Sequence, residues 1–202
     1  MIRPFGDAAL LVELASADFA QALAASLRGD PPPGMVAAVP GLASLLVEFD
    51  PLSADAEVVS SAIEDRMVGL GPMPPSGRLH TIPVTYDGPD LESVAQLTGL
   101  APAEVVARHS STELRVLFCG FAPGFAYLGD LPSELRVERL ATPRTRTPAG
   151  SVAIAGSMSG IYPADLPGGW RVIGRTSVAL FDPDRDPPAL LLPGDRVHFE
   201  PA

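Results

Sequence analysis

Residues 142–156 read TPRTRTPAGSVAIAG, and this stretch sets the pattern for the second half of the chain. A short, mostly apolar run at 151–155 follows a turn-forming Pro-Ala-Gly and ends at another glycine. Similar short runs, broken by Gly and Pro, recur from Glu113 onward. Short apolar runs separated by Gly and Pro are typical of an antiparallel barrel or sandwich. We therefore expect strands at residues 114–118, 151–155, 171–174, 178–181, 189–192 and 196–199.

The first half of the chain alternates strand and helix patterns instead. Apolar residues alternate at 9–14 and 44–49, and a third short apolar run lies at 35–39, as in strands with a buried face. At 19–27 and 59–70 the apolar residues recur every three or four positions, which is the spacing of an amphipathic helix. The predicted order is β-α-β-β-α.

A Gly- and Pro-rich segment at 69–77 indicates a boundary between two domains. The strand pattern that follows at 80–86 has two interpretations: it completes a ferredoxin-like β-α-β-β-α-β unit, or it opens the second domain. The sequence does not decide between them. We expect an α+β protein with a small ferredoxin-like domain at 1–77 and a β-barrel domain at 78–202.

The composition indicates a folded protein and excludes several classes of function. Hydrophobic residues make up 47% of the 202 residues, which provides the apolar surface that disordered segments lack. No apolar run approaches the roughly 20 residues of a membrane helix, and the N-terminus lacks the apolar core of a signal peptide. We expect a cytoplasmic protein without membrane partners. A net charge of −10 argues against nucleic-acid binding, which requires cations to neutralise phosphates.

All 14 basic residues are arginine, and the chain contains no lysine. A Walker A loop, a Schiff base, a pyridoxal site and a biotinyl carrier each need a lysine amine, so none of these is expected here. Residues 1–77 carry three Arg against ten acidic residues, whereas residues 113–175 carry seven against five. Anion binding is therefore expected in the second half. The alternative for any single arginine is a solvated surface charge.

Three Gly- and Pro-rich segments combine permissive backbone with aromatic or Arg side chains: 120–128 (GFAPGFAYL), 142–152 (TPRTRTPAGSV) and 160–170 (GIYPADLPGGW). In the first, Pro123 and Gly124 fit the centre of a type II turn. Loops of this kind on a rigid scaffold often form binding sites. The alternative is that they only form corners of the barrel.

A series of longer motifs resembles one family over nearly the whole chain. The motifs stand in the family's order: 86–91 (YDGPDL), 109–110 (HS), 120–128, 143–144 (PR), 148–156 (PAGSVAIAG), 160–163 (GIYP), 167–170 (PGGW), 173–176 (IGRT) and 193–195 (PGD). They resemble the family of the 5-oxoprolinase B subunit, which is also described as allophanate hydrolase subunit 1, as sporulation kinase inhibitor and as part of the carboxyltransferase domain of urea carboxylase. Leu114, Met158 and Leu166 stand within or beside positions where the family commonly has hydrogen-bonding residues, so the exact substrate stays open.

The resemblance implies a small N-terminal α+β domain followed by a cyclophilin-like β-barrel. It also implies one component of an ATP-dependent enzyme that opens the lactam ring of 5-oxo-L-proline to give L-glutamate. The implied partners are a protein resembling the C subunit of 5-oxoprolinase and a third protein that completes ring opening. ATP, with Mg²⁺, is the implied cofactor, bound in the complex with the partner.

The implied chemistry assigns roles to residues within the motifs. Binding a carboxylate and stabilising a transferring phosphoryl group suit Arg forks, so we expect Arg144 and Arg175 to bind anions. His109 is a candidate general acid or base, with a hydrogen-bonded structural histidine as the alternative. The expected substrate-binding residues, with core packing as the alternative for the aromatic ones, are Phe121, Pro123, Gly124, Phe125, Tyr127, Ser151, Tyr162, Gly168, Gly169 and Trp170.

Two other functions and one absence complete the expectations. The chain could act as a non-catalytic inhibitor of a histidine kinase, or as the carboxyltransferase half of a urea- or allophanate-type amidolyase with biotin supplied by another protein. Cys119 is the only cysteine and the three histidines are dispersed. The sequence therefore predicts no metal site built from protein side chains alone.

Overall fold

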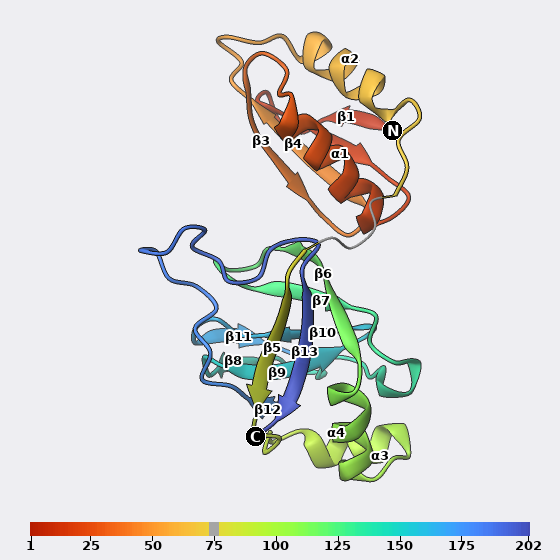
Figure 1. Ribbon diagram of the computed structural model, residues 1–202, viewed down its shortest axis with the longest axis vertical. Helices are drawn as coiled ribbons and strands as arrows, with labels where there is room; N and C mark the ends of the chain where they lie inside the picture. Colours follow the sequence, from red (N-terminus) through yellow and green to blue (C-terminus); the bar gives the residue numbers. More distant parts are fainter. Residues whose placement is uncertain (73–76) are drawn as a thin grey trace. The chain divides into compact units, whose positions relative to one another are not determined.

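The computed structural model describes residues 1–72 and 77–202, which divide into two units, Met1–Ser76 and Gly77–Ala202 (Figure 1). Residues 73–76, part of the Gly- and Pro-rich segment expected at the domain boundary, lie outside the described residues. Each unit has a hydrophobic core of its own.

The first unit is an antiparallel sheet with two helices packed on it (Figure 1). Alternate strand residues such as Leu45 and Val47 are buried against Leu23 and Leu27 of the first helix and Ile63 of the second. The period of two in the strands and of four in the helices produces this single core. The sheet order is β1-β2-β4-β3, and the elements in chain order are β1 (Ile2–Pro4), β2 (Ala9–Glu13), α1 (Ala17–Gly29), β3 (Met35–Pro40), β4 (Ser44–Phe49) and α2 (Ala56–Met67).

The first unit differs from the expected ferredoxin-like domain in one strand. The predicted β-α-β-β-α order is present as β2-α1-β3-β4-α2. The strand that would complete the unit, β5 (Leu79–Val84), belongs instead to the second unit, where it pairs in parallel with β13 (Arg196–Pro201). The sheet edge beside β2 is occupied by β1, which reaches it through a short hairpin. The ambiguity that the sequence left at 80–86 is thereby resolved.

The second unit is built on a mixed, largely antiparallel sheet in the order β12-β9-β10-β7-β6-β13-β5, beside a separate β11-β8 ribbon. Its core contains Leu114, Val116, Ile154, Ile173 and Phe199. The helices contact strands β12 and β13 (Figure 1). Between β5 and β13 the elements are α3 (Leu91–Thr98), α4 (Pro102–Ser110), β6 (Glu113–Cys119), β7 (Ala126–Gly129), the 3₁₀ turn η1 (Ser133–Leu135), β8 (Arg144–Thr147), β9 (Ser151–Ala155), β10 (Met158–Ile161), β11 (Leu166–Gly168) and β12 (Arg171–Arg175).

A seam of backbone hydrogen bonds nearly closes this sheet into a barrel. Beyond β5 the chain reaches the opposite edge strand, where Thr85 and Arg175 exchange two N–H···O bonds of 2.9 Å. The Gly88 N–H then donates to the Ile173 carbonyl at 3.1 Å, and the Asp90 N–H donates to the Val172 carbonyl at 2.9 Å. Closure of this kind removes the unpaired strand edges that would otherwise expose backbone groups. We call residues 85–90 and their partners on β12 the seam.

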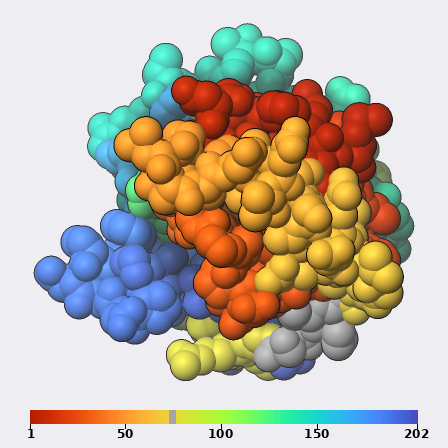
Figure 2. Space-filling view, turned by 90° about the horizontal axis from the view of Figure 1, so that it is seen from above, coloured from red at the N-terminus to blue at the C-terminus, as the bar shows by residue number. Residues whose placement is uncertain are grey.

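Two predicted strands are absent from the described structure of the second unit. The segments 178–181 and 189–192 meet only at one bridge, between Phe181 and Ala189. They belong to the long connection between β12 and β13, which extends away from the barrel as a lobe drawn in blue (Figures 1 and 2). The Arg185 side chain donates to the carbonyls of Leu180, Pro187 and Pro188. These bonds replace the ladder that a strand would supply.

None of the helices in the described ranges combines the length and apolar character that a membrane crossing needs.

We expect Gly88 to be essential to the seam. A Cβ atom at this position would overlap backbone atoms of Ile173 and Val172, which cannot move without opening the barrel. Gly88→Ala should therefore lower the free energy of unfolding by about 1–3 kcal/mol, as measured by urea denaturation. A Cβ at Gly120 would meet open space, so Gly120→Ala should stay within about 0.5 kcal/mol of the wild type. Equal stability of the two variants would contradict the close approach at the seam.

Candidate functional site

A pocket of about 240 Å³ lies beside the seam, at the end of the barrel where β5 gives way to residues 85–90. Three predicted site residues, Arg144, Ser151 and Arg175, line it. They come from different strands, since Arg144 opens β8, Ser151 opens β9 and Arg175 ends β12. Asp87 of the seam also lines the pocket. The fold therefore brings together the two arginines that the sequence selected as anion binders.

The turn at 148–151 gives one wall of the pocket a fixed shape. The Ser151 N–H and hydroxyl both donate to the Pro148 carbonyl, at 3.2 and 2.7 Å. Gly150 has a φ of 80°, a left-handed conformation that glycine adopts without strain. A Cβ at Gly150 would also overlap the Thr176 carbonyl oxygen. This explains the glycine within the PAGS motif.

Arg175 forms an exposed, bidentate ion pair with Asp87. Its Nε donates to both carboxylate oxygens of Asp87, at 3.1 and 2.9 Å, and Nη2 lies 2.8 Å from Oδ2. The two side chains are 67% and 47% exposed. The hydrogen bond from Arg175 lowers the pKa of Asp87, and the same bond raises the pKa of Arg175. Both groups are therefore charged at neutral pH.

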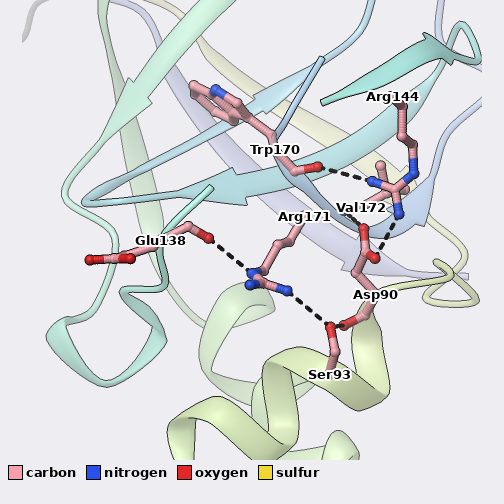
Figure 3. Close-up of polar contacts among 7 residues, drawn as sticks. All are labelled: Asp90, Ser93, Glu138, Arg144, Trp170, Arg171 and Val172. Atoms are coloured by element: carbon pink, nitrogen blue, oxygen red, sulfur yellow. Dashed lines mark hydrogen bonds and ion pairs between the residues drawn. The ribbon is translucent and has the colours of Figure 1, made fainter. Parts of the chain in front are cut away.

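Arg144 forms the second ion pair, with Asp90, in a much more buried setting (Figure 3). Its Nη2 donates to Asp90 Oδ1 at 2.7 Å, and Nη1 donates to the Trp170 carbonyl at 3.4 Å. Asp90 is only 6% exposed, and its other oxygen accepts the Val172 N–H at 2.7 Å. Asp90 occupies the N-cap position of α3 without a side-chain capping bond. Its carboxylate fastens the start of the helix to β12 and β8 instead.

A second arginine supports the same helix start from β12. The Arg171 Nε donates to the Glu138 carbonyl at 2.9 Å, and its Nη1 donates to the Ser93 hydroxyl at 3.3 Å. That hydroxyl in turn donates to the Asp90 carbonyl at 2.9 Å. Figure 3 shows the two arginines on either side of the Asp90 segment. The position of Asp90, and with it that of Arg144, is therefore fixed by several independent bonds.

His109 is buried in the core of the barrel unit and does not line this pocket. Its ring stacks on Phe199 with centroids 4.6 Å apart. The Ser159 hydroxyl donates to the Ala153 carbonyl, so it accepts from His109 Nε2–H at 2.9 Å, and Nδ1 accepts the Tyr86 hydroxyl proton at 2.8 Å. Burial lowers the pKa of His109 to about 3. This environment is that of the structural alternative, because a neutral, fully bonded ring has no free nitrogen for proton transfer.

The predicted aromatic residues form a packed cluster and do not line the pocket. Phe125, Tyr162 and Trp170 are buried, and Phe125 makes edge contacts with the other two at centroid distances of 5.5 and 5.7 Å. Tyr127 is half-buried and stacks on Phe118. Edge and offset arrangements stabilise aromatic cores. These side chains therefore carry the packing role that the sequence left open.

The two glycines of the PGGW motif lie beside the aromatic cluster and the segment around Leu140. A Cβ at Gly168 would overlap the Tyr162 ring. The Gly169 carbonyl accepts the Leu140 N–H at 2.7 Å. Neither glycine lines the pocket beside the seam.

The type II turn at Pro123 and Gly124 is confirmed. The Phe125 N–H donates to the Ala122 carbonyl at 3.0 Å, and Gly124 has a φ of 81°. Phe121, just before the turn, has a φ of 71°, an uncommon conformation for a bulky residue. Its side chain is 58% exposed. This turn lies outside the pocket that contains the arginines.

The Cys119 thiol is unsuited to act as a nucleophile in this structure. Burial and the nearby charge of Asp195 raise the pKa of the Cys119 thiol to about 11, so the thiol stays protonated at neutral pH. Among the described residues, no group of three or more His, Cys, Asp or Glu side chains is arranged to hold a metal ion.

The comparisons with known proteins identify the family. Residues 1–191 match the family model described as carboxyltransferase domain, subdomain C and D. The 5-oxoprolinase B subunit of Escherichia coli O157:H7 is 46% identical over 176 residues, which cover 84% of this chain and 79% of that protein. The chain belongs to the family of the 5-oxoprolinase B subunit.

Solved structures support the fold of this family member. The crystal structure of TTHA0988 matches all of this chain with a TM-score of 0.85 and 39% sequence identity. The chain covers only 40% of TTHA0988. The urea carboxylase of Kluyveromyces lactis matches with a TM-score of 0.80 at 22% identity, over 100% of this chain and 21% of that one. At that identity the likeness shows the fold alone.

Sequence reasoning missed Asp87 and Asp90 as site residues. Both lie in the YDGPDL motif, and each pairs with an arginine from another motif, PR or IGRT. One signal was available in the sequence: a single motif contains two acidic residues, and other motifs of the same chain contain the arginines. That signal does not say which acid meets which arginine.

His109 should make the protein less stable in acid. In the folded state the ring stays neutral with a pKa of about 3, whereas the pKa of an unfolded histidine is about 6.5. Between these values only the unfolded state binds the proton. The contribution of this residue to the free energy of unfolding should therefore fall by about 1.4 kcal/mol per unit as the pH drops below about 6.5.

The measurement is urea denaturation at a series of pH values from 8 to 4.5. His109→Gln should be less stable at pH 8 and should lose this slope, because glutamine does not titrate. His198→Gln is the matched control at a half-buried histidine and should keep the slope. An unchanged slope in His109→Gln would show that other groups cause it.

Proposed function

We propose that this chain is the B subunit of an ATP-dependent 5-oxoprolinase, which converts 5-oxo-L-proline to L-glutamate only in a complex with partner proteins. The observation that carries the proposal is the convergence of Arg144 and Arg175 on one small pocket. The 46% identity to a relative named as the B subunit of 5-oxoprolinase supports the choice of substrate. The expected partners are a protein resembling the C subunit of that enzyme and a third protein, in the cytoplasm.

The proposed reaction begins with activation of the lactam. Amide resonance makes direct hydrolysis slow, so the γ-phosphoryl group of ATP is transferred to the lactam oxygen and ADP leaves. Water then attacks the ring carbon, and the C–N bond breaks as the nitrogen takes up a proton, which leaves an acyl phosphate. A second water hydrolyses this acyl phosphate to the carboxylate of L-glutamate and inorganic phosphate. Arg forks suit these steps because they bind carboxylates and stabilise charge on a transferring phosphoryl group.

The pocket can contribute to this reaction through its remaining donors. A guanidinium carries five N–H groups, and the bonds to Asp87 occupy the Nε and Nη2 side of Arg175. Nη1 is available to a ligand. At about 240 Å³ the pocket is smaller than the roughly 300–1,000 Å³ of sites for drug-sized ligands. It suits 5-oxoproline or a phosphate group, and the rest of the nucleotide, with its Mg²⁺, would lie on the partner.

Several features of the chain support dependence on a partner. It has no lysine for a phosphate-binding loop. His109 is buried and Cys119 is protonated, so neither can act as a base or nucleophile at the pocket. In TTHA0988 the matching region is 40% of a longer chain, which is consistent with this fold working beside further protein.

We expect the purified chain to be folded but inactive. Incubation with 5-oxo-L-proline and Mg-ATP should release no glutamate above background. The chain coexpressed with its two expected partners, the C-subunit-like protein and the third protein, should release glutamate in an ATP-dependent manner. Ring opening by the chain alone would contradict the proposal.

Arg175→Ala should reduce turnover of the assembled enzyme by about 100-fold or more, the usual loss for a preorganised donor. Its thermal midpoint should stay near that of the wild type because the side chain is exposed. Arg175→Lys should fail nearly as badly, since lysine keeps the charge but lacks the planar fork. Arg108→Ala, which breaks another partly exposed Arg–carboxylate pair, is the control and should keep its turnover.

Arg144→Ala should lose turnover and also stability. It removes the cation from the buried carboxylate of Asp90, at a cost of about 1–3 kcal/mol. Turnover and thermal midpoint are measured on the same preparations. If Arg144→Ala and Arg175→Ala both keep near wild-type turnover, the arginines are structural and the pocket is not the site.

A further inference from the structure

The two arginines of the pocket are paired with acids from one short segment, but the two pairs differ in how firmly they are held. Asp90 is buried and accepts from two partners, Arg144 and the Val172 N–H. Asp87 is half-exposed, and its carboxylate is bonded by the Arg175 side chain. Breaking the first pair would leave a buried charge, whereas breaking the second would return both groups to water. A ligand can therefore replace only the second acid at low cost.

The Asp87 carboxylate holds Arg175 in the way that an anionic ligand would. It is a planar carboxylate that accepts hydrogen bonds from the Nε and Nη2 edge of the guanidinium, and this edge is one of the two that bind carboxylates and phosphates in bidentate fashion. Both groups line the pocket. An incoming anion that binds this edge of Arg175 must displace the Asp87 carboxylate.

We propose that Asp87 is an internal competitor for the anion site: it occupies the fork of Arg175 until a ligand carboxylate or phosphoryl group displaces it, while Arg144 keeps Asp90 in both states. The inference rests on the proposed function of this pocket. It makes Asp87 a specificity-determining residue. A ligand without an anionic group leaves the Asp87–Arg175 pair closed, so neutral lactams and amides are selected against.

The size of the effect follows from the exposure of the pair. Exposed ion pairs contribute little, and breaking one typically changes an equilibrium by a factor of about 1.5 to 5. Asp87 should therefore weaken anion binding by no more than about fivefold, and the pair should not block the site. Removal of its charge should tighten binding by the same factor.

The test measures binding of 5-oxo-L-proline and of inorganic phosphate to the full chain by calorimetry, and the KM for 5-oxo-L-proline in the assembled enzyme. Asp87→Asn should lower the dissociation constant or KM about two- to fivefold with an unchanged thermal midpoint. Glu113→Gln is the matched control, because it removes one charge from the exposed Glu113–Arg196 pair. Arg196 lies opposite Leu79 at the start of β5, whereas the pocket lies beyond its end. This control should leave both constants unchanged.

A double variant tests the mechanism. Asp87→Asn combined with Arg175→Ala should bind no more tightly than Arg175→Ala alone, because Asp87 acts only by occupying Arg175. Tighter binding in the double variant would indicate a general charge effect and overturn the inference. Unchanged or weaker binding in Asp87→Asn would also overturn it, since Asp87 would then be absent from the competition or would help to hold the ligand.

Failure of this inference can be told apart from failure of the proposed function. If Arg175→Ala binds both anions and turns over like the wild type, the pocket is not the anion site and the proposed function of the pocket falls. If Arg175→Ala loses binding but Asp87→Asn does not tighten it, only the inference falls. Should the isolated chain bind neither probe measurably, the KM values of the assembled enzyme decide. Asp87→Ser repeats the test if Asp87→Asn does not fold.

Discussion

The backbone pairing of residues 85–90 with β12 is the constraint on which the second unit depends. It joins the two edges of the sheet, so that the barrel is nearly closed around its apolar core. The same short segment points three side chains at different partners: Tyr86 bonds His109, Asp87 pairs with Arg175 and Asp90 pairs with Arg144. The same backbone pairing therefore both closes the barrel and positions the acidic residues that pair with the two arginines.

The three contacts of the seam differ in burial, and burial decides what each can do. The Tyr86–His109 contact is in the core, where the cost of desolvation keeps the imidazole neutral and the ring serves packing. The Asp90–Arg144 pair is partly buried and holds the start of α3 to β8 and β12. Of these three contacts, the Asp87–Arg175 pair is the one that faces enough water to exchange partners. Within residues 86–90, the buried contacts therefore serve the fold, and the exposed contact of Asp87 is suited to ligand exchange.

The division between packing and binding also explains the Gly- and Pro-rich segments. Their aromatic rings meet in a buried cluster around Phe125, because large apolar rings gain more from full burial than from a place on the wall of an open pocket. Their glycines and prolines shape turns and short strands, among them β8 and β11. From these segments, the pocket is lined by Arg144, by Thr147 and by residues of the turn of fixed shape at 148–151.

Features that depend on local period and composition could be predicted from the sequence. These are the order β2-α1-β3-β4-α2 in the first unit, the barrel-like character of the second, the type II turn at Pro123 and Gly124, and the family through its ordered motifs. Arg144, Ser151 and Arg175 could be selected because each lies in a motif. The sequence could not assign β5 to a unit, because the pattern of a strand does not name its neighbour. Which groups meet, and how deeply they are buried, depended on the folded arrangement instead. Arg144 and Asp90 are 54 residues apart in the chain, and Arg175 and Asp87 are 88 apart. Their pairing is set by the closure of the barrel, to which local sequence period contributes no information. The buried, neutral state of His109 has the same origin: the desolvation that fixes its charge comes from strands and loops distant in sequence, which surround the ring only once the sheet has closed.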